Sequence, residues 1–126
     1  MNKRFGFKEI RTSMGLFDFD VICIVGDYKN AGKYIRWKFE DKEFSPEKWD
    51  LGYEPRGKCF FSQGYVPVIW IPKKPRTPRE IATLAHECIH AVFHLFAWAS
   101  LSMTRDTEEV LCHSTAHLVN NILKNL

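Results

Sequence analysis

Residues 79–126 contain neither glycine nor proline. These two residues are the ones that most often interrupt a helix, so their absence favours long helices in this part of the chain. Before Pro78, short apolar runs alternate with turn signals, a pattern that is typical of β-strands. Strands followed by helices predict an α+β fold.

The apolar runs in the first part of the chain predict a small antiparallel or mixed β-sheet. Its strands are expected over residues 20–25, 34–39, 59–62 and 66–71. Asn30, Ala31 and Gly32 are expected to form a hairpin turn between the first two strands. The segment Ser45-Pro46-Glu47-Lys48 is expected to form a short helical turn or to begin a loop.

Composition limits the class of protein. With 126 residues, of which 45% are hydrophobic, the chain can bury a core as a single domain over residues 1–126. A net charge of +3 does not by itself indicate a nucleic-acid partner. The longest apolar stretch, Ala91–Leu101, is far below the ~20 residues that cross a bilayer. Lys8, Glu9 and Arg11 interrupt any signal peptide, so a cytoplasmic location is expected, with reduced cysteines.

A long helix is expected to follow the strands. Its start is predicted at Thr77-Pro78-Arg79-Glu80, because Thr77 can cap the helix, Pro78 needs no N–H donor in the first turn and Glu80 can complete a capping box. The helix is expected to run to about Leu101. It is apolar on nearly every face, which predicts that it is buried between other layers.

A second helix is expected at the C-terminal end, capped near Asp106 or Thr107 and running from Glu108 almost to Leu126. All five histidines of the chain fall within the two expected helices. The predicted architecture is therefore an N-terminal sheet packed on a buried helix and a C-terminal helix.

The segment His86-Glu87-Cys88-Ile89-His90 matches the pattern HExxH, which this composition gives by chance about 0.01 times per chain. In a helix, residues four apart lie on one face, so the two imidazoles can bind one ion at roughly 2.0–2.1 Å each. Two core histidines bonded to the backbone are the alternative. Three polar groups in an apolar helix are costly to bury without an ion, so the spacing predicts a zinc site.

A catalytic zinc ion takes three protein ligands and keeps one position for water. His94 is in line with the motif, but eight residues along a helix span about 12 Å, too far for the same ion. The next helix offers four candidates for the third ligand, Glu108, Glu109, His113 and His117. A glutamate in a first helical turn also interacts favourably with the helix dipole, so one of the two glutamates is expected to have only that role.

The segments Leu84–Ala91 and Glu109–His113 resemble small HExxH proteins of phages and prophages, in the gluzincin class of zinc metallopeptidases. In that family a Glu-x-x-Ala-Tyr run supplies the third ligand, and this implies Glu109 in this chain. Because the two glutamates are adjacent, Glu108 remains the alternative.

The resemblance covers residues 77–119. It implies a minimal zincin-like fold, a protein or peptide substrate and, for a phage protein, the cytoplasm of the host cell. Cys112 and His113 depart from the family, which carries alanine and an aromatic residue there.

In zincins an edge strand beside the motif helix pairs with the extended substrate. Residues 66–72 are the candidate, since their two prolines suit an edge and not a central position; a buried strand under the helix is the alternative.

These residues together predict zinc-assisted hydrolysis of a peptide bond. With His86, His90 and Glu109 as ligands, the ion lowers the pKa of its water toward ~7 and polarises the scissile carbonyl. Glu87 accepts the proton of the water and passes it to the leaving amine. Four side chains are candidates to stabilise the oxyanion: His113, His117, Tyr65 and Arg105.

Two other functions are open at this stage. In the first, zinc clamps the two helices and the protein is a non-catalytic interaction module, in which Glu87 has no functional role. In the second, the protein acts at nucleic acid, where the phosphate contacts would be Lys73, Lys74, Arg76 and Arg79. A charged run in a loop is usually only solvated, so the sequence does not favour nucleic acid as the partner.

Overall fold

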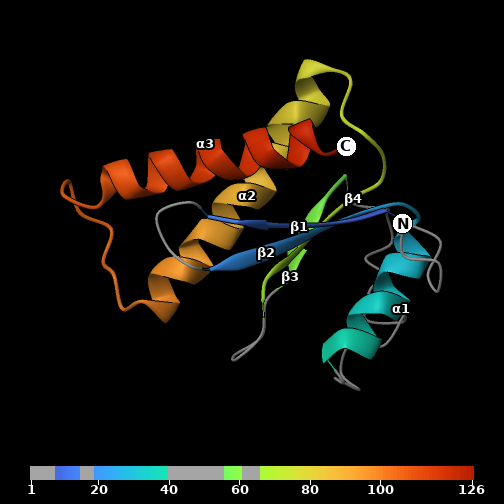
Figure 1. Ribbon diagram of the computed structural model, residues 1–126, viewed down its shortest axis with the longest axis horizontal. Helices are drawn as coiled ribbons and strands as arrows, with labels where there is room; N and C mark the ends of the chain where they lie inside the picture. The colour runs from blue at the N-terminus through green and yellow to red at the C-terminus, as the bar shows by residue number, and fades with distance from the viewer. Residues whose placement is uncertain (1–7, 15–18, 40–55, 61–65) are drawn as a thin grey trace.

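Figure 1 shows the computed structural model of the protein, which describes residues 8–14, 19–39, 56–60 and 66–126. Its elements are, in chain order, β1 (Lys8–Ser13), β2 (Asp20–Val25), α1 (Tyr28–Phe39), β3 (Lys58–Phe60), β4 (Val68–Ile71), α2 (Pro78–Trp98) and α3 (Glu108–Lys124). The predicted α+β fold is confirmed. The helical turn expected over residues 45–48 lies outside the described residues.

The four strands form one mixed sheet. Its order is β1-β2-β4-β3, with β1 antiparallel to β2, β2 parallel to β4, and β4 antiparallel to β3. The strand expected over residues 20–25 is present as β2, and the strand expected over residues 66–71 is present in its last four residues as β4. The strand expected over residues 59–62 is β3, of which the described part ends at Phe60.

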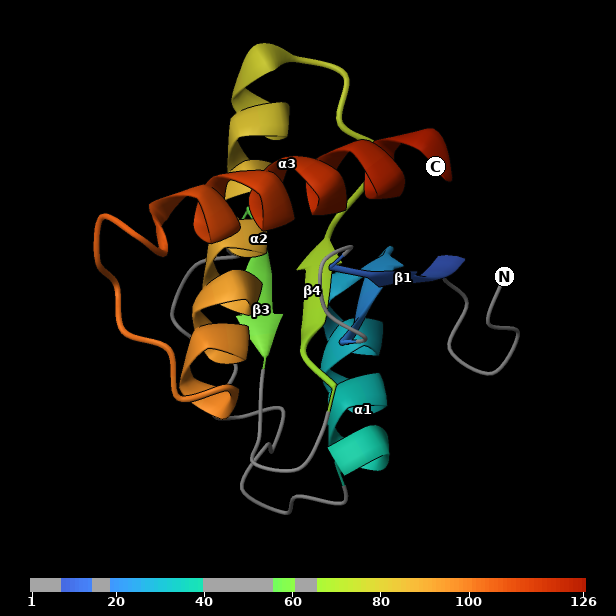
Figure 2. The same ribbon diagram turned by 60° about the vertical axis from the view of Figure 1, so that its left-hand side comes forward.

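The helices cover the two faces of this sheet separately. The core between α1 and the sheet consists of Ile22, Ile24, Ala31, Tyr34, Ile35, Phe60, Val68 and Trp70. The core between the sheet, α2 and α3 includes Cys23, Ile69, Leu84, Cys88, Leu118 and Ile122. Figure 2 shows α1 on the other side of the strands from α2 and α3. Neighbouring residues of β2 and β4 therefore point into different cores.

Two predictions for residues 30–39 differ from the structure, in which helix α1 occupies this segment. Residues 34–39 were expected to form a strand and residues 30–32 a hairpin turn, and both predictions are wrong because this segment is helical. The side chains of Ala31, Tyr34 and Ile35 are buried against the sheet. This i, i+3, i+4 spacing is the helical one, and it outweighs the partial alternation of polar and apolar residues that resembles a strand.

Contacts outside the helix itself fix the start of α1. The Asp27 carboxylate accepts hydrogen bonds from the backbone N–H groups of Lys29 and Asn30, at 2.8 and 3.1 Å. The indole N–H of Trp70 in β4 donates to the carbonyl of Gly26, at 2.9 Å. The helix is thus capped by Asp27 and tied to the centre of the sheet just before its first turn.

Two alternatives were open for β4, an edge strand that pairs with substrate and a buried strand under the helix. The edge position is wrong and the buried strand is confirmed. β4 lies between β2 and β3, and all four of its residues are buried. The two prolines that suggested an edge, Pro67 and Pro72, flank the strand and remove no N–H from its interior. The carbonyl of Pro67 even accepts a hydrogen bond from the N–H of Ile22, at 3.1 Å.

The described edge strands are β1 and β3. β1 is not predicted by the sequence, because only Ile10 of its six residues is buried and charged residues surround it. An edge strand with one covered face needs few apolar side chains, so it gives a weak signal in the sequence.

Helix α2 begins where the sequence predicts. The hydroxyl of Thr77 accepts from the N–H of Glu80, and the carboxylate of Glu80 accepts from the N–H of Thr77, both at 3.2 Å. This is the expected capping box. The helix ends at Trp98, before the expected Leu101, because Ser100 adopts a left-handed conformation with φ of 55°.

The expectation that α2 is buried on every side is wrong. One face is exposed. In the first turn it carries Arg79, and beyond that turn it consists of Ala82, His86, Ile89, His90, Phe93 and Ala97. At 3.6 residues per turn these six positions fall within an arc of about 100°. We call this surface the open face of α2. The sheet and α3 cover much of the remaining circumference, although Ile81 and Trp98 near the two ends are also exposed. An apolar sequence therefore does not require a fully enclosed helix here.

Helix α3 has the expected extent and packs against α2 and β1. Thr107 occupies the capping position, but its hydroxyl bonds within the preceding loop, where it donates to the carbonyl of Ser102 at 2.6 Å. Among the described residues, no helix combines the length and the apolar character that a membrane span requires.

Candidate metal centre

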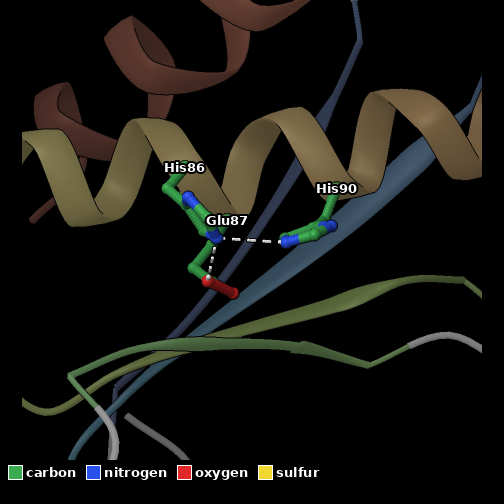
Figure 3. Close-up of side chains that lie close together, drawn as sticks. All are labelled: His86, Glu87 and His90. Carbon is green, nitrogen blue, oxygen red and sulfur yellow. Dashed lines mark hydrogen bonds and ion pairs between the residues drawn. The ribbon is translucent and has the colours of Figure 1, made fainter.

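The two histidines of the HExxH motif converge on the open face of α2. Their Nε2 atoms are 3.1 Å apart, and their rings meet edge to face with centroids 4.8 Å apart. Figure 3 shows both imidazoles projecting from the same side of the helix, one turn apart. This arrangement follows from the i, i+4 spacing, which places residues four apart on one helical face.

The distance between these nitrogens suits a tetrahedral metal ion. Two ligand atoms that each lie 2.0–2.1 Å from a zinc ion at a tetrahedral angle are about 3.3 Å apart. The observed separation of 3.1 Å is within a few tenths of an ångström of that value. His86 and His90 are also exposed, so the space beyond their nitrogens is open to an ion and to a substrate. The donor set therefore fits zinc.

Glu87 completes the cluster from the buried side. Its carboxylate lies 3.7 Å from Nε2 of His86, and the ligand atoms of the three residues all lie within 4.8 Å of one another. Unlike the two histidines, Glu87 is only 6% exposed. Burial raises the pKa of its carboxyl above the usual value, and electrostatic interactions with His86, His90 and Lys58 partly oppose this.

Gly57 lies next to Glu87 on its buried side, and the sequence gives no sign of this contact. A Cβ atom at Gly57 would lie 3.3 Å from Cγ of Glu87, 2.9 Å from Cγ2 of Thr83 and 3.4 Å from the carbonyl of Trp70. The backbone just before β3 thus approaches α2 closely at the position of Glu87. Nothing in the sequence distinguishes this glycine from one in an ordinary turn, because the close approach exists only in the folded chain.

The predicted third ligand is not part of this cluster. Of the described residues that can bind metal, the close group contains only His86, Glu87 and His90. The carboxylate of Glu109 lies 3.3 Å from Nε2 of His113, one turn further along α3, and both side chains are exposed. Neither Glu109 nor the alternative Glu108 is brought to the two imidazoles, so the identity of the third ligand remains a prediction.

The other histidines have separate surroundings. The ring of His94 lies 6.1 Å from that of Phe19, and burial lowers its pKa. Nε2 of His117 lies 2.9 Å from the side-chain nitrogen of Asn121, which donates to the hydroxyl of Thr12 in β1. Neither histidine joins the metal cluster, and for His94 this agrees with the distance expected along the helix.

Of the four candidates for oxyanion stabilisation, the three that the structure describes have other surroundings. His113 is paired with Glu109 and His117 with Asn121, while Arg105 lies exposed in the loop between α2 and α3. Tyr65 lies outside the described residues.

Comparisons with models of protein families, with curated proteins and with solved structures find no match to this chain. Two exposed imidazoles and one buried carboxylate on a single helix can hold a metal ion and place a base beside it.

Proposed function

We propose that the protein is a zinc-dependent peptidase in which His86 and His90 bind the ion and Glu87 is the general base. The observation that carries the proposal is the pairing of two exposed imidazole nitrogens, 3.1 Å apart, with a buried carboxylate 3.7 Å from one of them. A purely structural metal site is closed by four protein ligands, whereas this cluster is open to solvent on one side.

The burial of Glu87 supports its role as a base. When bound, zinc supplies Lewis acidity, which polarises a carbonyl and makes a water molecule acidic near neutral pH. Glu87 accepts the proton of the attacking water at its carboxylate and delivers it to the nitrogen of the leaving amine. A carboxyl whose pKa is raised by burial holds that proton more readily than an exposed one.

The third ligand belongs to the proposal as well. We assign it to Glu109 in the first turn of α3, with Glu108 as the alternative. A His₂Glu set leaves one position for water, as catalysis requires. For Glu109 to bind, its carboxylate must leave His113, with which it forms an exposed pair, and the start of α3 must bring it to the two imidazoles.

Because β4 is central, we propose β3, in place of residues 66–72, as the strand that pairs with the substrate. β3 lies at an edge of the described sheet, is antiparallel to its neighbour β4 and packs against α2. An extended peptide that adds to an edge strand gains main-chain hydrogen bonds while the metal site acts on one of its carbonyls. The partner is accordingly a protein or peptide.

We place this activity in the cytoplasm. All four cysteines are free thiols, and Cys23 and Cys88 are fully buried in the core between the sheet and the helices. Burial raises the pKa of Cys23 to about 12. Such thiols are packing residues, which suits a reducing compartment.

The substitution Glu87→Gln tests the proposal. We expect the variant to bind close to one zinc ion per chain, measured by elemental analysis, and to lose peptide cleavage by a factor of about 100 or more. His86→Ala should lose both zinc and cleavage, whereas His94→Ala should lose neither. If Glu87→Gln cleaves as fast as the native chain, the carboxylate is not the base. Zinc binding without cleavage by the native chain would instead identify a non-catalytic metal module.

A further inference from the structure

The open face of α2 surrounds the two metal-binding imidazoles with apolar side chains. Its other members are Ala82, Ile89, Phe93 and Ala97, and none of them is charged. Ile89 is 38% exposed and Phe93 is 46% exposed. Exposed helix faces normally carry charged or polar residues, so an apolar stripe beside a metal site calls for a partner.

The position of the stripe identifies what covers it. Ile89 is three residues from His86, and Phe93 is three residues from His90, so each lies next to an imidazole on the helix surface. Because both imidazoles belong to this face, a carbonyl group held beside their Nε2 atoms would lie next to it. The groups attached to that carbonyl are then within reach of Ile89 and Phe93.

We propose, on the basis of the function proposed above, that the substrate is a peptide segment with a large apolar side chain next to the scissile bond, and that Ile89 and Phe93 bind this side chain. Arg79, the charged residue in line with this face, is seven residues before His86, about 10 Å along the helix. A charged side chain held beside Ile89 and Phe93 would therefore lose water there without gaining a partner. An apolar side chain gains from the same contact.

A pair of zinc-chelating probes tests the proposal without requiring turnover. Alanine hydroxamate and phenylalanine hydroxamate differ only by a phenyl group. On the zinc-loaded native chain, isothermal titration calorimetry should show the phenylalanine probe to bind about tenfold more tightly. In the variants Ile89→Ser and Phe93→Ser, the ratio of the two dissociation constants should fall to about twofold or less, while the alanine probe binds as tightly as to the native chain.

Ile81→Ser is the matched control. Ile81 is an isoleucine in the same helix and is 40% exposed, but it lies outside the arc of the open face. This variant should keep the full preference for the phenylalanine probe. If both probes bind the native chain equally, or if Ile81→Ser loses the preference as Phe93→Ser does, the proposal is overturned and the proposed function stands.

Peptide cleavage tests the same preference on a substrate, and sedimentation tests whether a second copy of the chain covers the open face instead. Among peptides that differ at one residue beside the cleaved bond, phenylalanine should be cleaved at least tenfold faster than aspartate, mainly through KM. If the two peptides are cleaved at the same rate, the inference about Ile89 and Phe93 is wrong, but the proposed function stands. If the chain binds no zinc, both the inference and the proposed function are wrong. A zinc-loaded dimer that Phe93→Ser dissociates would assign the face to a second copy of the chain and overturn the inference.

Discussion

Glu87 and Gly57 show how closely the metal cluster depends on single residues. The carboxylate of Glu87 is buried beside two exposed imidazoles because α2 and the backbone before β3 approach each other at Gly57. The approach leaves no room for a side chain at residue 57. The position of the Glu87 carboxylate therefore depends on a residue that has no functional group of its own.

Gly57→Ala should disturb this arrangement. The new Cβ would lie 2.9 Å from Cγ2 of Thr83 and 3.3 Å from Cγ of Glu87, so helix and strand must separate slightly. We expect a loss of about 1–3 kcal/mol in the free energy of unfolding, measured with denaturant, together with slower peptide cleavage.

The second substitution Thr83→Ser provides the control for Gly57→Ala. It removes the methyl group that makes the closest contact and keeps the hydroxyl, which donates to the carbonyl of Arg79 at 3.1 Å. The double variant should recover part of the lost stability. If Gly57→Ala is as stable as the native chain, the close approach is not required for the fold.

At the scale of elements, the two ends of α2 are fixed by different means. Its start is held by the reciprocal hydrogen bonds of Thr77 and Glu80, which are encoded within four residues of sequence. At its end, the N–H of Leu101 donates to the carbonyl of Phe96 at 2.8 Å, and Ser100 takes the left-handed conformation that such a termination requires. Glycine normally occupies this position.

Ser100→Gly should therefore stabilise the protein. Glycine reaches φ of 55° without the steric cost that serine bears, so we expect a gain of about 0.5–1 kcal/mol in the free energy of unfolding. Ser102→Gly, two residues further in the same loop, is the control and should bring no gain, since Ser100 is the only described residue other than glycine with positive φ. A similar gain in both variants would show that the effect does not depend on backbone conformation.

For the whole molecule, the proposed zinc site needs a ligand from α3, so we expect the packing of α3 against α2 to affect zinc binding. Zinc that binds only the folded chain should raise the free energy of unfolding by about 2.7 kcal/mol at a concentration of 100 Kd. We expect Glu109→Gln to weaken zinc binding about 100-fold, because it replaces a charged ligand with a neutral amide.

Glu108→Gln is the matched control for the third ligand. It removes the same charge one residue away and should change zinc affinity by less than about threefold, through long-range electrostatics alone. The reverse order of effects would assign the ligand to Glu108. Equal and small effects would show that α3 supplies no ligand.

The local features of this protein are encoded in short stretches of its sequence. The capping box that starts α2, the HExxH spacing that brings His86 and His90 together, and the extent of α3 all depend on residues within a turn or two of one another, so they can be read directly from the chain.

Only the tertiary structure decided the rest. α1 is a helix because Ala31, Tyr34 and Ile35 pack on the sheet, and β4 is central because β3 pairs with it on one side and β2 on the other. The open face of α2, the burial of Glu87 and the close approach at Gly57 likewise arise from segments far apart in the chain. Hydrophobic burial is non-directional, so a pattern of apolar residues reveals that a segment is covered but not which segment covers it.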